Sequence, residues 1–405
     1  MTSRKIKLAY LVTHPIQYQA PLLKRIAREP DIDLTAFFCS DLSVRAYQDP
    51  GFGVEVKWDV PLLDGYQYKF LKTLGRTDLV SSWRPFNFGL LSELRKGKFD
   101  VLWMHGYARP YHWYVAVVAR LLGIKVLVRD EATDFSAARG PIRRQLKRIF
   151  FWLFATLCNG FLAIGTSNRQ YYLKNGIPAG RIFNMPYAVD NAYFSNKACE
   201  VSKRRESLRA SLGLTPGCPV ILFASKLTAR KRPDLLLDAY ARLLADWESD
   251  SPPYLIFIGD GELRPQLERQ VSERHLSTVK ILGFANQSEL PAYFDLCDVF
   301  VLPSVHEPWG LVVNEAMCAG RAVIVSDKVG CAADLVHHLE NGYVFREDSV
   351  ADLQKALLTV IRDSRVAAEM GSNSHKLMAR WDFEADVVGL NAALRSCGSS
   401  DSIIL

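Results

Sequence analysis

The chain has 405 residues, of which 49% are hydrophobic and 23% charged, and its formal net charge is +7. At roughly 150 residues per domain, this length predicts two or three domains. The composition is that of a globular chain and excludes disorder, collagen and coiled coil. A charge of +7 spread along the chain is compatible with an anionic partner but does not identify one.

The eight cysteines form no C-x-x-C pair, and several lie within apolar runs. Zinc-ligand spacing is therefore absent, and a disulfide framework is not expected in a chain this long. Reduced, mostly buried thiols favour a cytoplasmic protein. The first apolar run, Leu8 to Val12, is too short for a signal peptide.

A longer apolar run extends from Ile149 to Ile164. It falls just short of the ~17–25 residues that span a bilayer, and Asn159-Gly160 interrupts it. We expect a helix that ends near Cys158, followed by a buried strand over Phe161 to Ile164.

Short apolar runs alternate with segments of helical periodicity in both halves of the chain. This alternation predicts βαβ units and parallel sheets that are buried on both faces. The expected strands are Ile6–Val12, Leu34–Phe38, Phe99–Met104, Lys125–Val128, Phe161–Ile164, Arg181–Met185, Val220–Ala224, Tyr254–Ile258, Val279–Leu282, Val299–Leu302 and Ala322–Val325. The expected helices are Ala20–Arg28, Tyr111–Leu122, Ile142–Leu157, Arg169–Asn175, Pro233–Leu244, Glu262–His275, Ser288–Cys297, Leu311–Ala319, Ala332–Leu339, Ala351–Arg362 and Phe383–Leu394.

The alternation lapses in two places. The segment from Asp49 to Phe88 is rich in Gly, Pro and aromatics and predicts a long surface excursion. The charged segment 196–217 ends in Thr215-Pro216-Gly217 and predicts a linker with one short helix. We therefore expect a first Rossmann-like domain over 1–195, a second over 218–380, and a final helix with a frayed tail over 381–405.

In open α/β sheets, ligands bind at the carboxyl ends of the strands. Lys226 and Lys231 follow the strand Val220–Ala224, and two lysines before a helix suit a phosphate or diphosphate; a solvated basic loop is the alternative. Gly259 and Gly261 follow the next strand and permit a tight turn close to a ligand.

The loop from Pro303 to Gly310 follows the strand Val299–Leu302 and precedes a helix. The first amides of that helix, near Trp309, Gly310 and Leu311, form an anion site. Glu307 and Glu315 would lie roughly 12 Å apart along a helix axis. That separation is too large for one metal ion or one reacting atom but suits the two ends of a nucleotide sugar.

Glu307 and Glu315, with Leu302-Pro303-Ser304 before them and Ala316-Met317 after, resemble the signature of glycosyltransferase family 4, whose members are retaining enzymes of the GT-B fold. The resemblance covers most of the chain. It extends to Ala224-Ser225-Lys226-Leu227 with Lys231, to Gly259-Asp260-Gly261, and to Leu282-Gly283-Phe284, which resembles the loop that cups the base. It implies two doubly wound domains that face a central cleft, with the last helix returning to the first domain.

The resemblance also implies a role for each residue of the second half. Lys226 and Lys231 would bind the diphosphate and Glu315 the ribose, while Glu307 would face the transferred sugar. Backbone amides from Trp309 to Leu311 would contact phosphate and sugar. The family usually has Arg where this chain has Lys226, and Lys keeps the charge but loses the planar fork.

In the first half, the resemblance assigns His105, at the end of the strand Phe99–Met104, to the donor sugar across the cleft. The loop with His14 and Gln17 matches the family's loop near donor and acceptor, although the usual glycine pair is missing. Arg129 and Glu131 end the next strand and line the acceptor side; a salt-bridged strand end is the alternative. Tyr187-Ala188 replaces the usual Asn-Gly.

The helix 139–157 carries a second hypothesis. Ile142, Leu146, Ile149 and Leu153 recur at helical spacing and predict the core face. Phe151 and Phe154 then fall among the bases on the opposite side, which suits an anionic membrane surface. Packing of these aromatics beneath a neighbouring loop is the favoured alternative.

The main functional hypothesis is a retaining glycosyltransferase that moves a sugar from a UDP- or GDP-linked donor to a hydroxyl of a glycan or lipid-linked sugar, in surface polysaccharide or glycolipid biosynthesis. We expect no cofactor besides the donor substrate. We also expect no metal ion, because Asp31-Ile32-Asp33, which mimics the D-x-D of metal-dependent transferases, lies at the start of its strand, the wrong end of the sheet. Catalytic roles fall to His105, Glu307 and Lys231, with front-face transfer. Localisation is expected to be cytoplasmic, including the inner face of the membrane.

Two alternatives remain open. A sugar-nucleotide epimerase of the same fold would bind the same donor and need no acceptor. A basic, non-catalytic binding protein is the other, although no aromatic-basic RNA motif is present and nucleic acid is not an expected partner. The sequence does not identify the nucleobase, the sugar, the acceptor or the oligomeric state.

Overall fold

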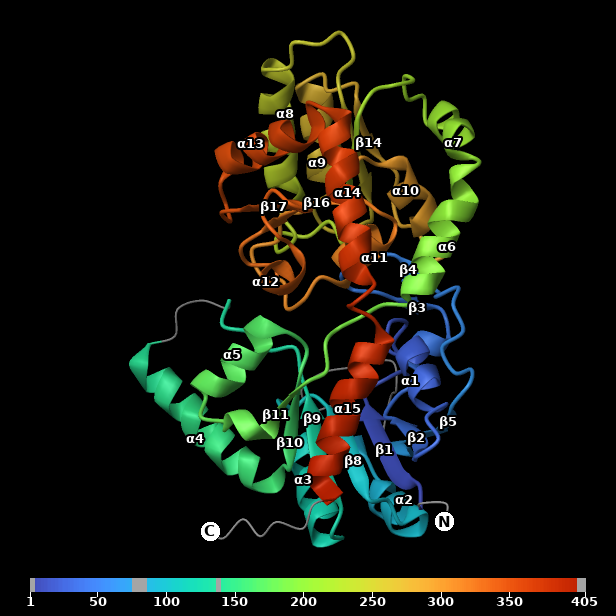
Figure 1. Cartoon of the computed structure of the whole chain (residues 1–405), viewed down its shortest axis with the longest axis vertical. Helices are drawn as coiled ribbons and strands as arrows, with labels where there is room; N and C mark the ends of the chain where they lie inside the picture. The colour runs from blue at the N-terminus through green and yellow to red at the C-terminus, as the bar shows by residue number, and fades with distance from the viewer. Residues whose placement is uncertain (1–3, 75–85, 136–139, 399–405) are drawn as a thin grey trace. The chain divides into compact units, whose positions relative to one another are not determined.

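Strands alternate with helices along most of the chain and build two parallel sheets (Figure 1). The computed structural model describes residues 4–74, 86–135 and 140–398. They divide into two units. Unit 1 comprises Met1–Tyr47, Val60–Tyr187 and Phe383–Leu405, and unit 2 comprises Gln48–Asp59 and Ala188–Asp382.

The sheet of unit 1 has the strand order β11-β10-β9-β8-β1-β2-β5, and its neighbouring strands run parallel. Its strands are β1 (Ile6–Val12), β2 (Ile32–Phe38), β5 (Gln67–Phe70), β8 (Val101–His105), β9 (Lys125–Arg129), β10 (Gly160–Ala163) and β11 (Ile182–Asn184). The helices of this unit are α1 (Ala20–Ile26), α2 (Leu90–Gly97), α3 (Pro110–Leu121), α4 (Pro141–Leu157), α5 (Thr166–Lys174) and α15 (Phe383–Gly398), with short 3-10 helices at Leu42–Val44 and Ala179–Arg181.

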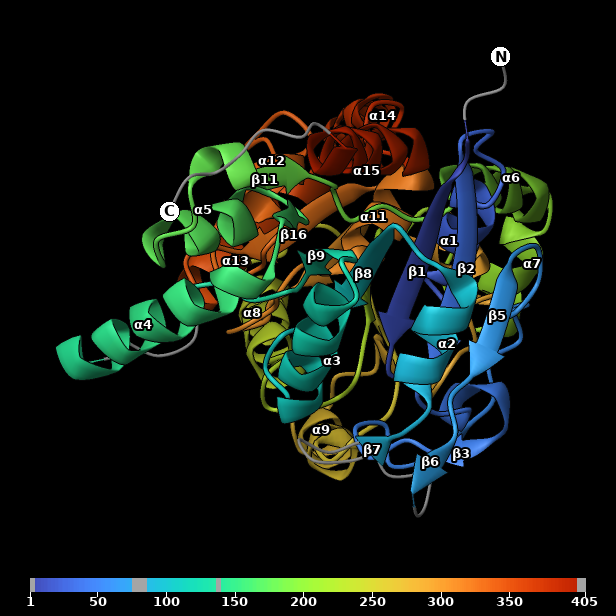
Figure 2. The ribbon, with the colours of Figure 1, turned by 90° about the horizontal axis from the view of Figure 1, so that it is seen from below.

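Alternate residues of each central strand of unit 1 enter two separate cores. Leu8 and Tyr10 of β1 pack with α1 and α15, whereas Ala9 and Leu11 pack with helices α2 to α5. Figure 2 shows α2 and α3 on one side of this sheet. Because both faces are covered, the central strands β1, β8 and β10 are mainly apolar, as buried parallel strands require, whereas the edge strand β5 is exposed.

Helix α15 is fixed to unit 1 by a buried ion pair and a close backbone approach. Arg129 Nη2 donates to Asp386 Oδ1 at 2.7 Å, and both side chains are buried. The same nitrogen donates to the carbonyls of Met185 and Pro186. A Cβ on Gly389 would lie 1.8 Å from the carbonyl oxygen of Asn184, so only glycine allows this contact with the end of β11. The expected return of the last helix to the first domain is confirmed.

The sheet of unit 2 has the order β14-β13-β12-β15-β16-β17, again with parallel neighbours. Its strands are β12 (Val220–Ala224), β13 (Tyr254–Ile258), β14 (Val279–Ile281), β15 (Val299–Leu302), β16 (Ala322–Ser326) and β17 (Gly342–Phe345). The helices are α6 (Asn191–Ser202), α7 (Arg205–Ser211), α8 (Pro233–Ala245), α9 (Arg264–Glu273), α10 (Leu290–Leu296), α11 (Leu311–Cys318), α12 (Ala332–Leu335), α13 (Val350–Ile361) and α14 (Ser364–Met378).

The predicted α/β class is confirmed, but several local features of the structure differ from the expectations. The segment 196–217 contains most of α6 and all of α7 rather than one short helix. The helix expected over Ala332–Leu339 ends at Leu335, and β17 and α14 were not predicted. A buried Asn341 side chain, which donates to the Leu335 carbonyl and accepts from the His337 amide, holds the turn where the helix ends.

The excursion predicted for Asp49 to Phe88 has defined structure in its described part. β5 forms the edge of the unit 1 sheet, and β6 (Thr73–Leu74) pairs with β7 (Phe86–Asn87). β3 (Tyr47–Gln48) and β4 (Glu55–Val56) form a further two-stranded sheet. The segment Gln48–Asp59 belongs to unit 2, although it precedes most of unit 1 in the sequence.

The predicted core face of α4 is wrong. Phe151 and Phe154 are fully buried against α3 and α5, where they contact the rings of Tyr107, Trp113 and Tyr171. The four residues predicted to be core are all exposed: Ile142, Leu146, Ile149 and Leu153. Both stripes have helical spacing, so periodicity alone could not decide between them, and it is Phe151 and Phe154 that occupy the core.

The apolar run that begins at Ile149 divides as expected, with α4 ending at Leu157 and β10 following from Gly160. In the ranges that the structure describes, we find no helix with the length and hydrophobicity needed to cross a membrane.

Candidate functional site

Lys231 and Glu307 meet at the carboxyl ends of two neighbouring strands of unit 2. β12 lies between β13 and β15, so successive crossovers proceed to opposite edges of the sheet from this point. Such a switch point leaves a crevice outside the strand ends, where α/β sheets bind ligands. Lys231 comes from the loop after β12 and Glu307 from the loop after β15.

The Lys231 ammonium donates to the Glu307 carboxylate, and both side chains are almost fully buried. Arg230 adds a second cation, because its Nη1 lies 3.4 Å from Glu307 Oε2 and donates to the carbonyl of His306 at 3.0 Å. Burial, together with the nearby charges of Arg230 and Lys226, lowers the pKa of Lys231 although the Glu307 carboxylate raises it. The structure thus brings together two residues predicted to be catalytic and adds Arg230, which was not predicted.

Lys226 lies in the same loop but pairs with an acid from another part of the chain. Its Nζ is 2.6 Å from Asp49 Oδ1 and 4.7 Å from the centre of the Phe52 ring. Burial favours the protonated acid, but the hydrogen bonds from Lys226 and from the Phe52 and Gly51 amides outweigh it and lower the pKa of Asp49. The Lys226 ammonium, which was predicted to bind phosphate, is therefore paired with the Asp49 carboxylate in this structure.

An aromatic cluster surrounds Phe284, the residue predicted to contact the base. The centre of the Phe52 ring lies 4.9 Å from that of Phe284, and the centre of the Trp58 ring lies 6.3 Å from it, both in edge-on arrangements. The side-chain amide of Asn286 donates to the Lys57 carbonyl at 2.7 Å. The segment Gln48–Asp59 thus packs along both predicted donor loops, a placement for which the sequence gives no periodic signal.

Gly259 and Gly261 are required by the approach of two loops. Both have positive φ, at 132° and 152°. A Cβ at Gly259 would lie 2.0 Å from the Ser225 carbonyl oxygen, and one at Gly261 would lie 2.6 Å from that of Leu227. These glycines therefore fix the loop after β13 against the loop that carries Lys226.

The start of α11 combines a backbone site with a buried indole. Gly310 precedes the helix with φ of 95°, and Leu311 is its first residue. The Trp309 side chain is buried, stacks on Trp381 at 5.6 Å, and donates to Asn314. The Trp309 indole is therefore engaged within the unit, and the predicted anion site stays a prediction that concerns the backbone amides of this terminus.

Glu315 lies on α11 and is largely buried, and burial raises its pKa to about 8. Within 4–74, 86–135 and 140–398, its carboxyl makes no hydrogen bond or ion pair. An acid without a protein partner in this position is protonated at neutral pH and can both donate to and accept from hydroxyls.

A second polar cluster lies at the carboxyl ends of β1, β8 and β9 in unit 1. His105 ends β8, and its Nε2 is 3.8 Å from Glu131 Oε1 and 3.3 Å from the Tyr187 hydroxyl. Gln19 Nε2 lies 3.2 Å from His105 Nδ1. The Tyr187 and Tyr18 hydroxyls donate to the same Glu131 oxygen at 2.5 and 3.1 Å.

These contacts determine the ionisation of Glu131. Burial would raise its pKa, but the contacts with His105, Tyr187 and Tyr18 lower it to about 2. Glu131 is therefore a fixed carboxylate that orients His105. The sequence predicted His105 and Glu131 as separate site residues, but neither their contact with each other nor their tyrosine partners, of which Tyr18 belongs to the loop with His14 and Gln17.

The other predicted residues of unit 1 differ in their surroundings. Burial and the charges of Arg109 and His105 lower the pKa of His14 to about 4, and its Nδ1 lies 2.9 Å from the Thr13 hydroxyl. Gln17 is half-buried between β1 and α1. Arg129, predicted to line the acceptor side, is instead buried in its ion pair with Asp386. This correction corresponds to the alternative of a salt-bridged strand end.

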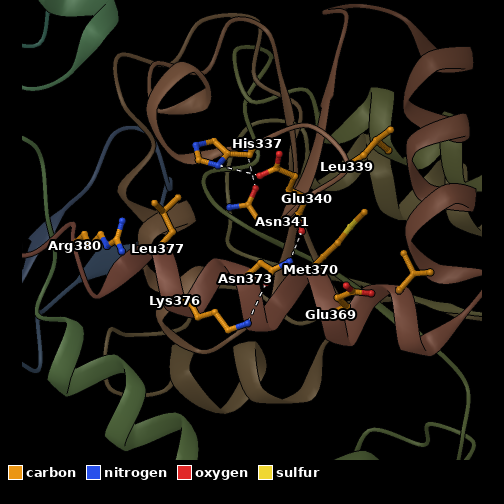
Figure 3. A pocket seen from close by; sticks show the side chains of 11 residues that line it. His337, Leu339, Glu340, Asn341, Glu369, Met370, Asn373, Lys376, Leu377 and Arg380 are labelled. Atoms are coloured by element: carbon orange, nitrogen blue, oxygen red, sulfur yellow. Dashed lines mark hydrogen bonds and ion pairs between the residues drawn. The ribbon is translucent and has the colours of Figure 1, made fainter.

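A cavity of about 650 Å³ lies elsewhere in unit 2, along α14 and the turn before β17 (Figure 3). No predicted site residue lines it, and Figure 3 shows side chains of both charges around it, including Glu340, Glu369 and Lys376. Over the described residues, no group of three or more His, Cys, Asp or Glu side chains could hold a metal ion.

The model of the family described as glycosyl transferases group 1 matches residues 204–377. This range contains Lys226, Lys231, Glu307 and Glu315. A D-inositol 3-phosphate glycosyltransferase of Nocardia farcinica is 31% identical over 336 residues, which cover 77% of this chain and 71% of the relative. The chain belongs to the glycosyl transferases group 1 family.

Other relatives of this group 1 chain match over different lengths. An uncharacterized glycosyltransferase of Methanocaldococcus jannaschii is 36% identical over 151 residues, or 36% of this chain and 37% of the relative. The chain thus matches little more than a third of that relative's length. An alpha-D-kanosaminyltransferase of Streptomyces kanamyceticus is 25% identical over 280 residues, or 66% and 69% of the two chains.

Solved structures confirm the predicted GT-B fold. A glycosyltransferase of Rickettsia africae superposes with a TM-score of 0.73 at 12% identity, covering 98% of this chain and 100% of the other. Alr3699/HepE of Anabaena, solved in complex with UDP and glucose, superposes with a TM-score of 0.69 at 18% identity, covering 96% and 100%. Both likenesses extend over nearly the whole chain.

Glu315→Gln is expected to stabilise this group 1 protein at neutral and higher pH. The folded-state pKa of about 8 exceeds the ordinary value of 4.5. The folded state therefore binds more protons than the unfolded chain in this window, and wild-type stability falls as pH rises through it. Glutamine cannot ionise, so the variant should exceed the wild type by up to about 4 kcal/mol near pH 8 and match it near pH 4.

Urea unfolding followed by circular dichroism at both pH values measures this difference. Glu369→Gln, an exposed substitution on α14, serves as the matched control and should keep the wild-type pH profile. Identical profiles for the two variants would contradict a buried, protonated Glu315.

Proposed function

We propose that this protein is a glycosyltransferase that moves a sugar from a nucleoside diphosphate sugar to a hydroxyl acceptor. The observation that carries the proposal is the convergence of Lys226, Arg230 and Lys231 on two acids at the switch point of unit 2. Three cations at this point, of which Lys231 is buried, suit a diphosphate leaving group, and the family membership favours a glycosyl donor.

Under this proposal, Lys226 and Lys231 bind the diphosphate, together with backbone amides at the start of α11. Lys231 is already desolvated, so its charge acts on a leaving phosphate with little screening by water. Fixed charges of this kind stabilise the negative charge that develops when the glycosidic bond breaks. Their contribution supports transfer that needs no metal ion.

The carboxyl groups would hold the two ends of the donor. Glu315, protonated and without a protein partner in the described chain, suits the ribose hydroxyls. Glu307 is held between Lys231 and Arg230 and suits the hydroxyls of the sugar. A carboxylate engaged by two cations is a weak nucleophile, which supports front-face transfer with retention of configuration rather than a covalent enzyme intermediate.

For the base and acceptor, the aromatic side chains around Phe284 offer a stacking surface. We propose a UDP- or GDP-linked donor, and the complexes of Alr3699/HepE with UDP and with UDP-glucose favour UDP. In unit 1, His105 oriented by Glu131 is proposed to contact the sugar during transfer. A glycan or lipid-linked sugar is the proposed acceptor.

Asp49→Asn is expected to tighten UDP binding by about two- to fivefold, because Asp49 competes with the diphosphate for Lys226. Isothermal titration calorimetry at constant ionic strength measures the effect. Asp59→Asn is the matched control, since this acid lies in the same segment but accepts from Ser288 instead of a lysine. Unchanged or weaker binding by Asp49→Asn would contradict a phosphate role for Lys226.

The proposed activity is tested by incubating the protein with panels of UDP- and GDP-sugars and pooled glycan acceptors. We expect free nucleoside diphosphate to appear in an acceptor-dependent way, together with a glycosylated product, and EDTA to leave the rate unchanged. Conversion of the donor sugar to its epimer without acceptor would instead indicate an epimerase. Binding of donor without any turnover would favour a binding protein.

A further inference from the structure

The outward face of α4 in unit 1 exposes a continuous apolar stripe. Its members are Ile142, Leu146, Ile149, Trp152 and Leu153, with exposed fractions between 45% and 76%. Figures 1 and 2 both show α4 at the edge of its unit. Large exposed side chains are common singly, but five on one helix form a patch that marks an interaction surface.

The helix is already anchored by its opposite face. Phe151 and Phe154 are fully buried, and the Lys147 ammonium lies 5.1 Å from the centre of the Tyr107 ring and 5.6 Å from that of Tyr171. Packing within the unit therefore does not require the apolar stripe. The stripe is therefore open to a partner outside the unit.

Basic residues border the stripe. At about 100° per residue, the aliphatic members lie within a sector of roughly 60°, Arg143 lies to one side of it and Arg148 to the other. Both arginines are exposed. The helix sequence Pro141–Leu157 contains four basic residues and neither Asp nor Glu. The surface is thus an apolar stripe with basic margins.

We propose that this face of α4 docks the protein on an anionic lipid bilayer. The aliphatic side chains and Trp152 would enter the boundary between head groups and acyl chains, while Arg143 and Arg148 would remain at the anionic head groups. Pairing with a second copy of the same face would place bases against bases, which opposes self-association. Charge complementarity therefore selects the bilayer, and this docking does not depend on the transferase activity.

Co-sedimentation of the full chain with phosphatidylcholine vesicles, with and without phosphatidylglycerol, tests the docking. We expect binding to the mixed vesicles that weakens with salt and is much lower on pure phosphatidylcholine. Substitution of Leu146, Ile149 and Trp152 together by Ser should weaken binding at least tenfold. Burial of even one such side chain in the bilayer changes the affinity by about tenfold. Val388→Ser, an exposed apolar position on α15, should bind like the wild type.

In a second variant, Arg143→Ala with Arg148→Ala, the affinity for anionic vesicles should fall about fivefold for each base removed. Its affinity for neutral vesicles should change little. Both variants alter exposed positions, and circular dichroism checks that each is folded. Equal binding of wild type and triple variant, or equal binding to both vesicle types, would overturn the proposal. So would light scattering that shows a wild-type dimer which the triple variant converts to a monomer.

Discussion

The buried ion pair between Lys231 and Glu307 is the interaction on which the candidate site depends. It joins the loops after two neighbouring strands at the point where the sheet order reverses. Removing one member would leave an uncompensated buried charge, a change that costs about 3–5 kcal/mol. The same burial keeps the Lys231 ammonium out of water. Under the proposed function, this one contact both joins the two loops and holds a cation for the diphosphate.

Unit 1 uses the same physical principle for a different purpose. Arg129 and Asp386 are buried more completely than Lys231 and Glu307, and their pair attaches α15 to the end of β11. Close to it, Glu131 remains ionised because two tyrosines and His105 share its charge. Buried charges at the carboxyl ends of the strands thus support the fold in one case and position a histidine in the other.

Much of the fold could be predicted from the sequence, because a buried parallel strand appears in it as a short apolar run. The strands β1, β12, β13 and β15 have the predicted bounds. Most of the predicted donor residues lie in loops that follow the strands, and Glu315 lies on α11, which such a loop precedes. Pairings distant in sequence could not be predicted: Asp49 reaches Lys226 across 177 residues. The buried face of α4 was misassigned because two stripes of side chains on this helix have the same helical spacing. Contacts with the rings of Tyr107, Trp113 and Tyr171, which the sequence pattern does not reveal, determine which stripe is buried.

The affinity for UDP of the double variant Lys231→Met with Glu307→Leu tests the central claim most directly. Replacing both members by apolar residues of similar size avoids a lone buried charge, so the fold should persist. If the pair holds a cation for the diphosphate, calorimetry should show binding weakened by at least about tenfold in a folded protein. Wild-type affinity in that folded variant would show that the pair is structural only and would contradict the account.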